Sequence, residues 1–178
     1  FRLFTFQWTD PTAEVSGSSG PDTDLDIALV DDQGTIVASE SSDNVSLGIP
    51  AEGGLEYTND TGSQATYNLI IEKADGPNPD QIKYIHSGSD YTIEEYDTQG
   101  PTVYGHPMAA DAEAVAAAPF YYTEAYSNNS ELPYLESFSS KAGIQIRFDQ
   151  NGDELSTYET RNKPDLTGAD RNDNTFFG

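Results

Sequence analysis

The feature that most constrains the fold of this chain is a series of short runs in which apolar and polar residues alternate. The run "RLFTFQW", residues 2–8, places Phe4, Phe6 and Trp8 at every second position, as in a strand with one buried face. Runs of similar length follow, with turn residues between them, at 25–39, 45–49, 54–59, 66–73, 81–87 and 91–97. About seven or eight short strands separated by turns predict an antiparallel β-sandwich of the jelly-roll type.

The clearest of these runs is "LDIALVDDQGTIVAS", which predicts a β-hairpin. Leu25, Ile27 and Leu29 alternate before the turn residues "DDQG", and Ile36 and Val37 follow the turn. The aromatic content, with 11 Tyr and 8 Phe, also suits β-structure better than a helical bundle.

The composition changes after residue 97. The stretch "GHPMAADAEAVAAAPFYY" is rich in alanine, and Pro107 suits the first position of a helix over 109–115. Pro119 then ends the helix or leaves a short buried strand behind it. We therefore predict a β-sandwich domain at 1–95 and a small mixed α/β segment at 96–178, in a chain that is mainly β.

A second hairpin is predicted in "IQIRFDQNGDEL". Its turn contains Asn151-Gly152, which favours a type I′ turn. The same stretch resembles the start of an EF-hand loop, but Glu154 occupies the position of the conserved loop glycine. A hairpin turn therefore explains the stretch better than a metal site does.

The net charge excludes several classes of partner. With 31 acidic and 8 basic residues, a net charge of −23, the chain has too few cations to neutralise phosphates. Nucleic acid and anionic membrane surfaces are therefore excluded. Two explanations of the acidity remain open: solubility in a salty environment, where ions screen self-repulsion, or carboxylates that hold Ca²⁺.

Five aspartates form the candidate calcium site. Three of them alternate in "PDTDLDI" and would project from one face of a strand, and two lie in the hairpin turn nearby. Hard cations such as Ca²⁺ take oxygen ligands, and no other cofactor is expected. The alternative is a solvated strand face with ordinary turn residues. The five residues are Asp22, Asp24, Asp26, Asp31 and Asp32.

The composition excludes cysteine chemistry and a membrane-spanning segment. The chain has no Cys, so disulfides and thiolate chemistry are absent, and no stretch approaches the roughly 20 apolar residues of a membrane span.

Four tyrosines of the second half would either line a sugar- or peptide-binding groove or cover the junction between the two halves. They are Tyr121, Tyr122, Tyr126 and Tyr134.

Three motifs, in order, resemble the last third of a subtilisin-like serine peptidase domain: "YLESFSSKAG", "RNKPDLTGAD" and "TFFG". The first half of the chain resembles a β-sandwich that large bacterial members insert into this domain. The sequence has "TGAD" where the family more often has "APG", which is a departure near the substrate side of its site. The resemblance also implies that Gly178 aligns with the glycine just before the family's nucleophilic Thr-Ser segment.

The resemblance implies a piece without catalytic residues. In the family, the Asp, the His and the oxyanion Asn come from earlier segments, and neither His86 nor His106 falls at the catalytic position. Both histidines are therefore interpreted as surface or capping residues. The residues that the resemblance places on the substrate-side wall are Ser137, Phe138, Ser139 and Asp165.

We therefore expect a piece of a secreted bacterial peptidase, whose partners are the remainder of its parent domain and a peptide substrate. No signal peptide is recognised, and the start at Phe1 is interpreted as a processing or cloning boundary. The C-terminal half is expected to pack against the sandwich or to self-associate, covering Phe176 and Phe177. The alternative is a self-contained extracellular β-sandwich module that binds glycans or is stabilised by Ca²⁺.

Overall fold

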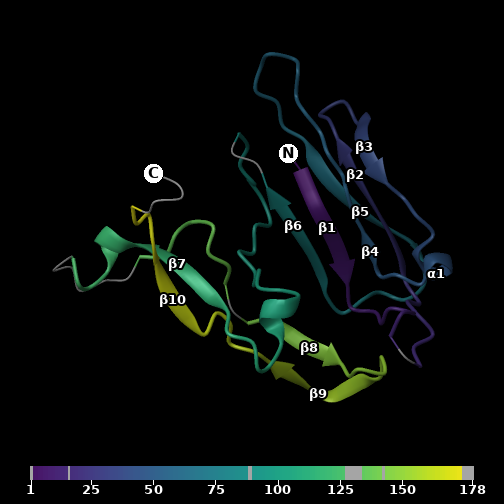
Figure 1. The fold of residues 1–178 in the computed structure, drawn as a ribbon. Helices are drawn as coiled ribbons and strands as arrows, with labels where there is room; N and C mark the ends of the chain where they lie inside the picture. The colour runs from purple at the N-terminus through teal and green to yellow at the C-terminus, as the bar shows by residue number, and fades with distance from the viewer. Residues whose placement is uncertain (1, 16, 88–89, 127–133, 142, 174–178) are drawn as a thin grey trace. The chain divides into compact units, whose positions relative to one another are not determined.

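A computed structural model describes residues 2–15, 17–87, 90–126, 134–141 and 143–173 of the chain, which forms two compact units (Figure 1). The first unit comprises residues 1–97 and 147–157, and the second comprises 98–146 and 158–178. The predicted division kept each domain continuous, at 1–95 and 96–178. In the structure, residues 147–157 belong instead to the first unit.

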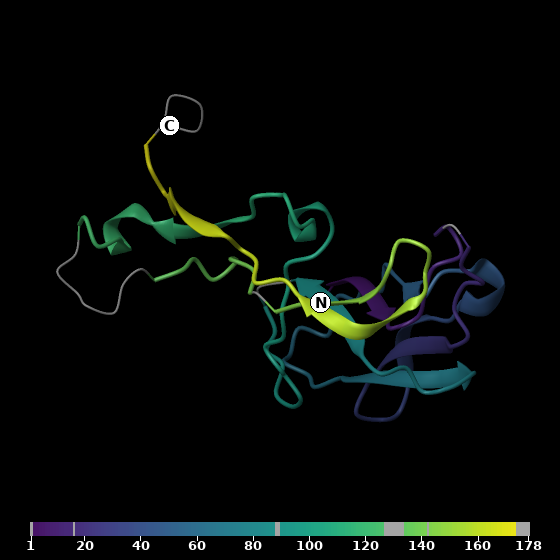
Figure 2. The same cartoon turned by 90° about the horizontal axis from the view of Figure 1, so that it is seen from below.

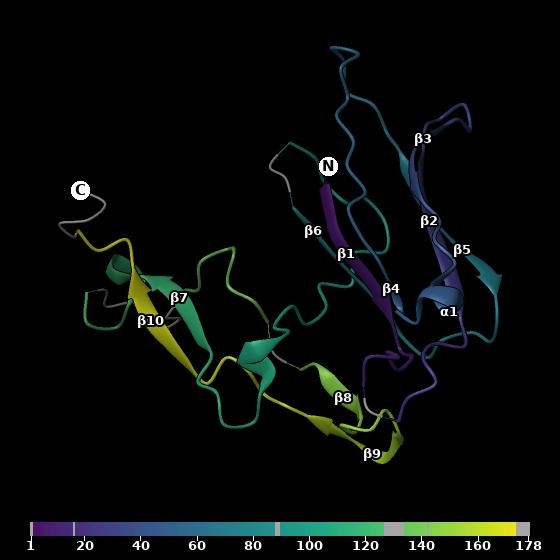
Figure 3. The same ribbon diagram turned by 45° about the vertical axis from the view of Figure 1, so that its right-hand side comes forward.

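The first unit contains two antiparallel sheets of three strands each (Figure 3). One sheet has the order β4-β1-β6, formed by β1 (Arg2–Trp8), β4 (Ala51–Glu52) and β6 (Ile82–Ser87). The other has the order β3-β2-β5, formed by β2 (Asp24–Val30), β3 (Ile36–Glu40) and β5 (Asn68–Asp75). The predicted mainly-β fold with antiparallel sheets is confirmed.

Both sheets contribute to one hydrophobic core. Alternation along β2 buries Leu25, Ile27 and Leu29, which are at most 6% exposed, as the sequence pattern predicts. Phe6 and Trp8 enter the same core from β1, with ring centroids 5.6 Å apart. Burying these side chains is the main favourable term for a unit of this size, at about 1.5–3 kcal/mol for each large apolar side chain.

Three predicted strands of the first half are absent or reduced. Residues 45–49 lie largely in the short helix α1 (Asn44–Leu47), because Asp43 Oδ1 accepts a hydrogen bond from Ser46 N at 2.9 Å and caps its start. Gly48, with φ of 72°, ends the helix in the left-handed conformation. No strand forms over 91–97, and 54–59 contains only an isolated bridge.

The two hairpin turns have the same construction. In Asp31–Thr35 the Asp31 Oδ1 accepts hydrogen bonds from the backbone N–H groups of Gln33 and Thr35, at 3.0 and 2.7 Å. In the turn 149–153 the Asp149 Oδ1 accepts from the third and fifth residues in the same way, at 2.7 and 3.1 Å. These backbone donors lower the pKa of the Asp149 carboxyl.

The predicted type I′ turn at Asn151-Gly152 is wrong. A type I′ turn needs a positive φ at both central residues, but only Gly152 has one, at 84°. Gly34 has the corresponding conformation in the first hairpin, at 82°. The Asp149 carboxylate accepts the N–H of Asn151 and so stabilises a turn that needs a single left-handed residue.

The two turn glycines differ in their surroundings, and this difference is testable. A Cβ on Gly152 would lie 2.8 Å from Ser18 Cβ, whereas a Cβ on Gly34 would meet nothing within 4 Å. We expect Gly34→Ala to lower the free energy of unfolding by about 1–2 kcal/mol through backbone strain alone. Gly152→Ala should cost about 1–3 kcal/mol more, because it adds a steric clash.

Urea unfolding followed by the fluorescence of Trp8, the single tryptophan, measures both variants in the first unit. Equal losses for the two substitutions would contradict the close packing of the second turn against Ser18.

One polar group of the first unit lies against the core. Glu52 is opposite Phe6 in the pairing of β4 with β1 and is 5% exposed. Its Oε1 accepts a hydrogen bond from Ser42 N at 2.8 Å, and the buried Asn44 donates through Nδ2 to the Ala51 carbonyl at 3.0 Å. Burial raises the pKa of the Glu52 carboxyl, because the charged form loses hydration.

Glu52 should therefore make the stability of the first unit depend on pH. A carboxyl whose folded pKa is raised contributes stability below its ordinary pKa of 4.5, and this contribution is lost as the pH rises through the folded pKa. Glu52→Gln cannot ionise, so the stability of the variant relative to wild type should increase from about pH 4 to about pH 7. Urea unfolding followed by Trp8 fluorescence measures this difference. The exposed Glu14→Gln is the matched control, and a difference for Glu52→Gln that does not change with pH would contradict the assignment.

The second unit is built on a parallel strand pair, β7 (Val115–Pro119) with β10 (Leu166–Asp170). Figure 2 shows the yellow strand β10 beside the green β7. Two short 3₁₀ helices, η1 (His106–Met108) and η2 (Phe120–Tyr122), lie before and after β7 in the chain. The hairpin of β8 (Gln145–Phe148) and β9 (Glu154–Thr160) has its tip in the first unit and its two chain ends in the second.

The predicted helix over 109–115 is wrong. Met108 O accepts a hydrogen bond from Arg161 Nη1 at 2.7 Å, and the Ala112 carbonyl accepts one from Lys163 Nζ, so side chains take carbonyls that a helix would use. Ala116 and Ala118 are buried in β7, at 7% and 1% exposed. A helix of two turns is only marginally stable by itself, and the strand pairing therefore outweighs the helix propensity of alanine. Across the described ranges, no helix has the length and apolar character needed to span a membrane.

Candidate functional site

The motif "ESFSS" lies along one edge of β7. Glu136 N donates to the Ala117 carbonyl at 2.8 Å. The Ser139 hydroxyl accepts a hydrogen bond from Ala117 N at 2.9 Å and donates one to Ala117 O at 3.0 Å. Ser139 thus pairs with both backbone polar groups of Ala117, in the middle of β7, as a neighbouring strand would. Its hydroxyl group therefore stabilises the strand.

The motif "KPD" attaches the start of β10 to the segment that leads into β7. Lys163 is 5% exposed, and its Nζ lies 3.0 and 2.9 Å from the two oxygens of Asp165. Asp165 Oδ2 also accepts a hydrogen bond from Ala114 N at 2.8 Å. The Ala114 N–H, followed by Lys163, lowers the pKa of the Asp165 carboxyl, which therefore stays charged at neutral pH.

Beyond the carboxyl end of β10, Arg171 forms an ion pair with Glu136. Its Nε and Nη2 lie 2.5 and 2.9 Å from the two Glu136 oxygens, a bidentate geometry, and its Nη1 donates to Tyr121 Oη at 3.0 Å. The Glu136 side chain is 5% exposed and that of Arg171 is 54% exposed. The carboxylate raises the pKa of Arg171 further above its already high ordinary value.

An aromatic group follows β7 directly, and we call it the tyrosine cluster. Each ring contacts at least one other ring of the cluster, with interplanar angles of 62–83° and centroids 4.7–6.0 Å apart. Exposed fractions of its tyrosines range from 39% for Tyr121 to 72% for Tyr126. The members are Phe120, Tyr121, Tyr122, Tyr126 and Tyr134.

The four predicted wall residues all belong to the second unit. Ser137 is exposed, and Phe138 is 67% exposed. Ser139 and Asp165 instead bond to the backbone of Ala117 and Ala114, so their structural roles are defined. Sequence reasoning missed Arg171 and Glu136 as a pair. The available signal was weak: a Glu within one motif and one of only 8 basic residues just after another.

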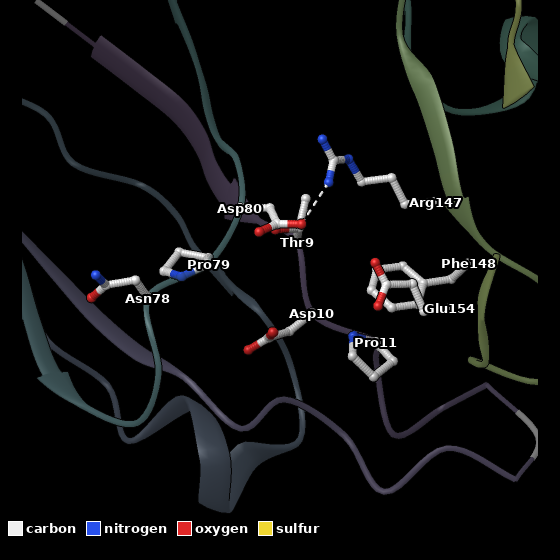
Figure 4. A pocket seen from close by; sticks show the side chains of 9 residues that line it. All are labelled: Thr9, Asp10, Pro11, Asn78, Pro79, Asp80, Arg147, Phe148 and Glu154. Atoms are coloured by element: carbon white, nitrogen blue, oxygen red, sulfur yellow. Dashed lines mark hydrogen bonds and ion pairs between the residues drawn. The ribbon is translucent and has the colours of Figure 1, made fainter. Parts of the chain in front are cut away.

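The first unit contains a polar pocket of about 220 Å³ (Figure 4). Arg147 Nη1 lies 3.0 Å from Asp80 Oδ2 across it, and Asp10 Oδ2 accepts a hydrogen bond from Thr23 N at 2.9 Å. Its lining residues come from three separate segments, which is why no sequence motif marked it. They are Thr9, Asp10, Pro11, Asn78, Pro79, Asp80, Arg147, Phe148 and Glu154.

The pocket is lined by charged side chains and one aromatic ring. Its only hydroxyl belongs to Thr9, whose Oγ1 accepts a hydrogen bond from Gln81 N at 3.1 Å. No histidine or serine lines it.

Two of the five predicted calcium ligands accept backbone hydrogen bonds. Asp24 Oδ1 accepts from Asn44 N at 3.2 Å, and Asp31 Oδ1 accepts the two turn N–H groups described above. Burial, followed by the charges of Asp24 and Glu72, raises the pKa of Asp26. Asp22 and Asp32 are exposed. Among the described residues, no group of three or more His, Cys, Asp or Glu side chains is arranged to hold a metal ion, and calcium binding stays a prediction.

The two histidines lie in different settings. The Nδ1 of His86, on β6, forms a hydrogen bond with the Tyr91 hydroxyl, and His106 begins η1. His86 belongs to the first unit and His106 to the second.

Comparison of the chain with protein families, with curated proteins and with solved structures finds no match.

The Arg171–Glu136 pair should contribute strongly to the stability of β7. Arg171→Ala leaves the Glu136 carboxylate buried without its counter-charge, so we expect hydrogen exchange at the Ala117 amide to become faster. Arg171→Lys keeps the charge but loses the bidentate geometry and should cost less. Hydrogen exchange of the β7 amides measures both effects. Unchanged exchange in Arg171→Ala would mean that the pair does not stabilise this strand.

Proposed function

We propose that this chain is a non-catalytic part of a secreted subtilisin-like serine peptidase. In this proposal the first unit is an inserted β-sandwich and the second unit is part of the α/β catalytic domain. The observation that carries the proposal is the placement of two resemblance motifs around one strand: "ESFSS" bonds to β7 through Ser139, and "KPDLTGAD" forms β10 beside it. The third motif, "TFFG", including Phe176 and Phe177, lies outside the described residues.

The exposure of the parallel pair supports the proposal independently. Parallel strands usually lie within larger sheets that are covered on both faces. Here Val115 and Leu166, which are opposite each other in the pairing, are 60% and 49% exposed. Such a pair is expected where the remaining strands and helices of a larger domain supply the cover. Self-association of the chain, which would also cover these residues, stays a prediction.

The parent enzyme would hydrolyse a peptide bond through an acyl-enzyme. In it, Asp165 holds the starts of β7 and β10, and Ser139 holds the middle of β7, rather than reacting. Ser137 and Phe138, which are exposed, remain candidates for the wall that a peptide substrate contacts. The role of this piece is therefore to support the active site and to position substrate.

The whole gene product, with the segments that flank these residues, tests the proposal. A fluorophosphonate probe should label a single serine shortly after Gly178, and replacing that serine by Ala should abolish the labelling. The 178-residue chain alone should stay unlabelled and should not cleave a peptide substrate. Absence of labelling in the whole product, or labelling of a serine within residues 1–178, would remove the peptidase assignment.

A self-contained glycan-binding or calcium-stabilised module is the second candidate. The exposed tyrosines favour a binding role, because aromatic rings are frequent in sugar and peptide sites. The aspartates give this candidate less support, since Asp24 and Asp31 already accept backbone hydrogen bonds.

A further inference from the structure

We propose that the polar pocket of the first unit binds one ring of a neutral sugar. All nine residues that line the pocket belong to the first unit. The proposal concerns this unit alone and does not depend on the peptidase assignment, which rests on motifs of the second unit.

The size of the pocket suits a single small ring. Its volume of about 220 Å³ is below the roughly 300–1,000 Å³ of sites that enclose drug-sized ligands. A group of the size of one sugar ring is therefore a better match than a larger ligand, and any further units of a saccharide would lie outside the pocket.

The pocket presents hydrogen-bond acceptors and donors together. The acceptors include the carboxylates of Asp10, Asp80 and Glu154. Arg147 carries only donors, and the amide of Asn78 carries both donors and an acceptor. An anion would use only the donors, and an ammonium group would use only the acceptors. A sugar hydroxyl both donates and accepts, so a group of hydroxyls can pair with the whole set.

Internal contacts hold two of the carboxylates and leave them capacity for a ligand. Asp10 Oδ2 accepts hydrogen bonds from Thr23 N at 2.9 Å and from Trp8 Nε1 at 3.3 Å, so its other oxygen can accept from a ligand. Asp80 Oδ2 lies 3.0 Å from Arg147 Nη1, which holds both side chains of this pair. Groups that are already held lose less conformational entropy when a ligand binds.

The side chain of Asn78 is the clearest group available to a ligand. It is exposed at the pocket, and within the described part of the chain no hydrogen bond engages its amide. The charge of the lining then favours a neutral sugar over an anionic one, because three carboxylates face a single guanidinium group.

Apolar side chains complete the lining. They are Pro11, Pro79 and Phe148. In the view of Figure 4, Pro11 and Phe148 lie to one side of Asp10 and Pro79 lies to the other. A sugar ring carries C–H groups beside its hydroxyls, so its mixed surface matches a pocket in which apolar and polar side chains alternate better than a hydrated ion does.

The test is a titration of the chain with the methyl glycosides of glucose, galactose, mannose and N-acetylglucosamine, followed by the fluorescence of Trp8. Trp8 is the single tryptophan and donates to Asp10, so a ligand that bonds to Asp10 should change its emission. At least one glycoside should give a saturable change. Its affinity should stay the same when NaCl is raised from roughly 0.1 to 1 M, because the ligand is uncharged.

Asn78→Ala should raise the dissociation constant of that glycoside by about three- to tenfold, because one hydrogen bond is lost. Asn78→Asp keeps the size of the side chain but removes its donors, so it should weaken binding as well. Asn68→Ala is the matched control, because Asn68 is an exposed asparagine of the first unit outside the pocket. It should leave the dissociation constant unchanged. Both asparagines are exposed, so the three variants should fold as the wild type does.

Four results would overturn the proposal. They are no saturable change with any glycoside, equal binding by the wild type and the Asn78 variants, equal weakening by Asn68→Ala, and displacement of the glycoside by methylammonium chloride. The last result would assign the pocket to a cation. None of them affects the labelling of the whole gene product by a fluorophosphonate probe, so failure of this proposal and failure of the peptidase assignment are distinguishable.

Discussion

Hydrogen bonds from backbone N–H groups to carboxylates are the interactions on which the loops of this protein depend. Asp31 and Asp149 each accept two N–H groups within a hairpin turn. Elsewhere, carboxylates of the same kind fix a helix start, a strand start and several loop residues; they are Asp10, Asp24, Asp43, Glu52 and Asp165. Such bonds are charge-assisted and satisfy backbone donors that irregular structure leaves unpaired. Part of the acidity is therefore structural.

The two units use different means to hold their strands. In the first unit, apolar side chains from two antiparallel sheets fill one core, and the polar Glu52 is admitted only with hydrogen-bond donors beside it. In the second unit, the parallel strands are short, and side chains replace missing neighbours: Ser139 bonds to the middle of β7, and Lys163 with Asp165 holds the start of β10. A strand pair supported in this way leaves apolar residues such as Val115 exposed.

The ion pair of the second unit lies next to the tyrosine cluster. Arg171 and Glu136 meet beyond the carboxyl ends of β7 and β10, next to Tyr121. Ligands of open α/β structures generally bind outside the carboxyl ends of parallel strands, because loops there can vary without disturbing the sheet. The ion pair and the tyrosine cluster therefore lie at the end of the strand pair where such loops form.

The local sequence pattern was sufficient to predict features that depend only on residues close together in the chain. The alternation of Leu25, Ile27 and Leu29 determined the buried face of β2, because side chains in a strand point to alternate sides. Tertiary pairing decided the rest. The alanines before Pro119 have a high helix propensity, yet they form a strand, because they pair with β10, some 50 residues later in the sequence. The meeting of Glu136 with Arg171, and the pocket formed by three distant segments, likewise follow from contacts between residues far apart in the sequence, which no local pattern encodes.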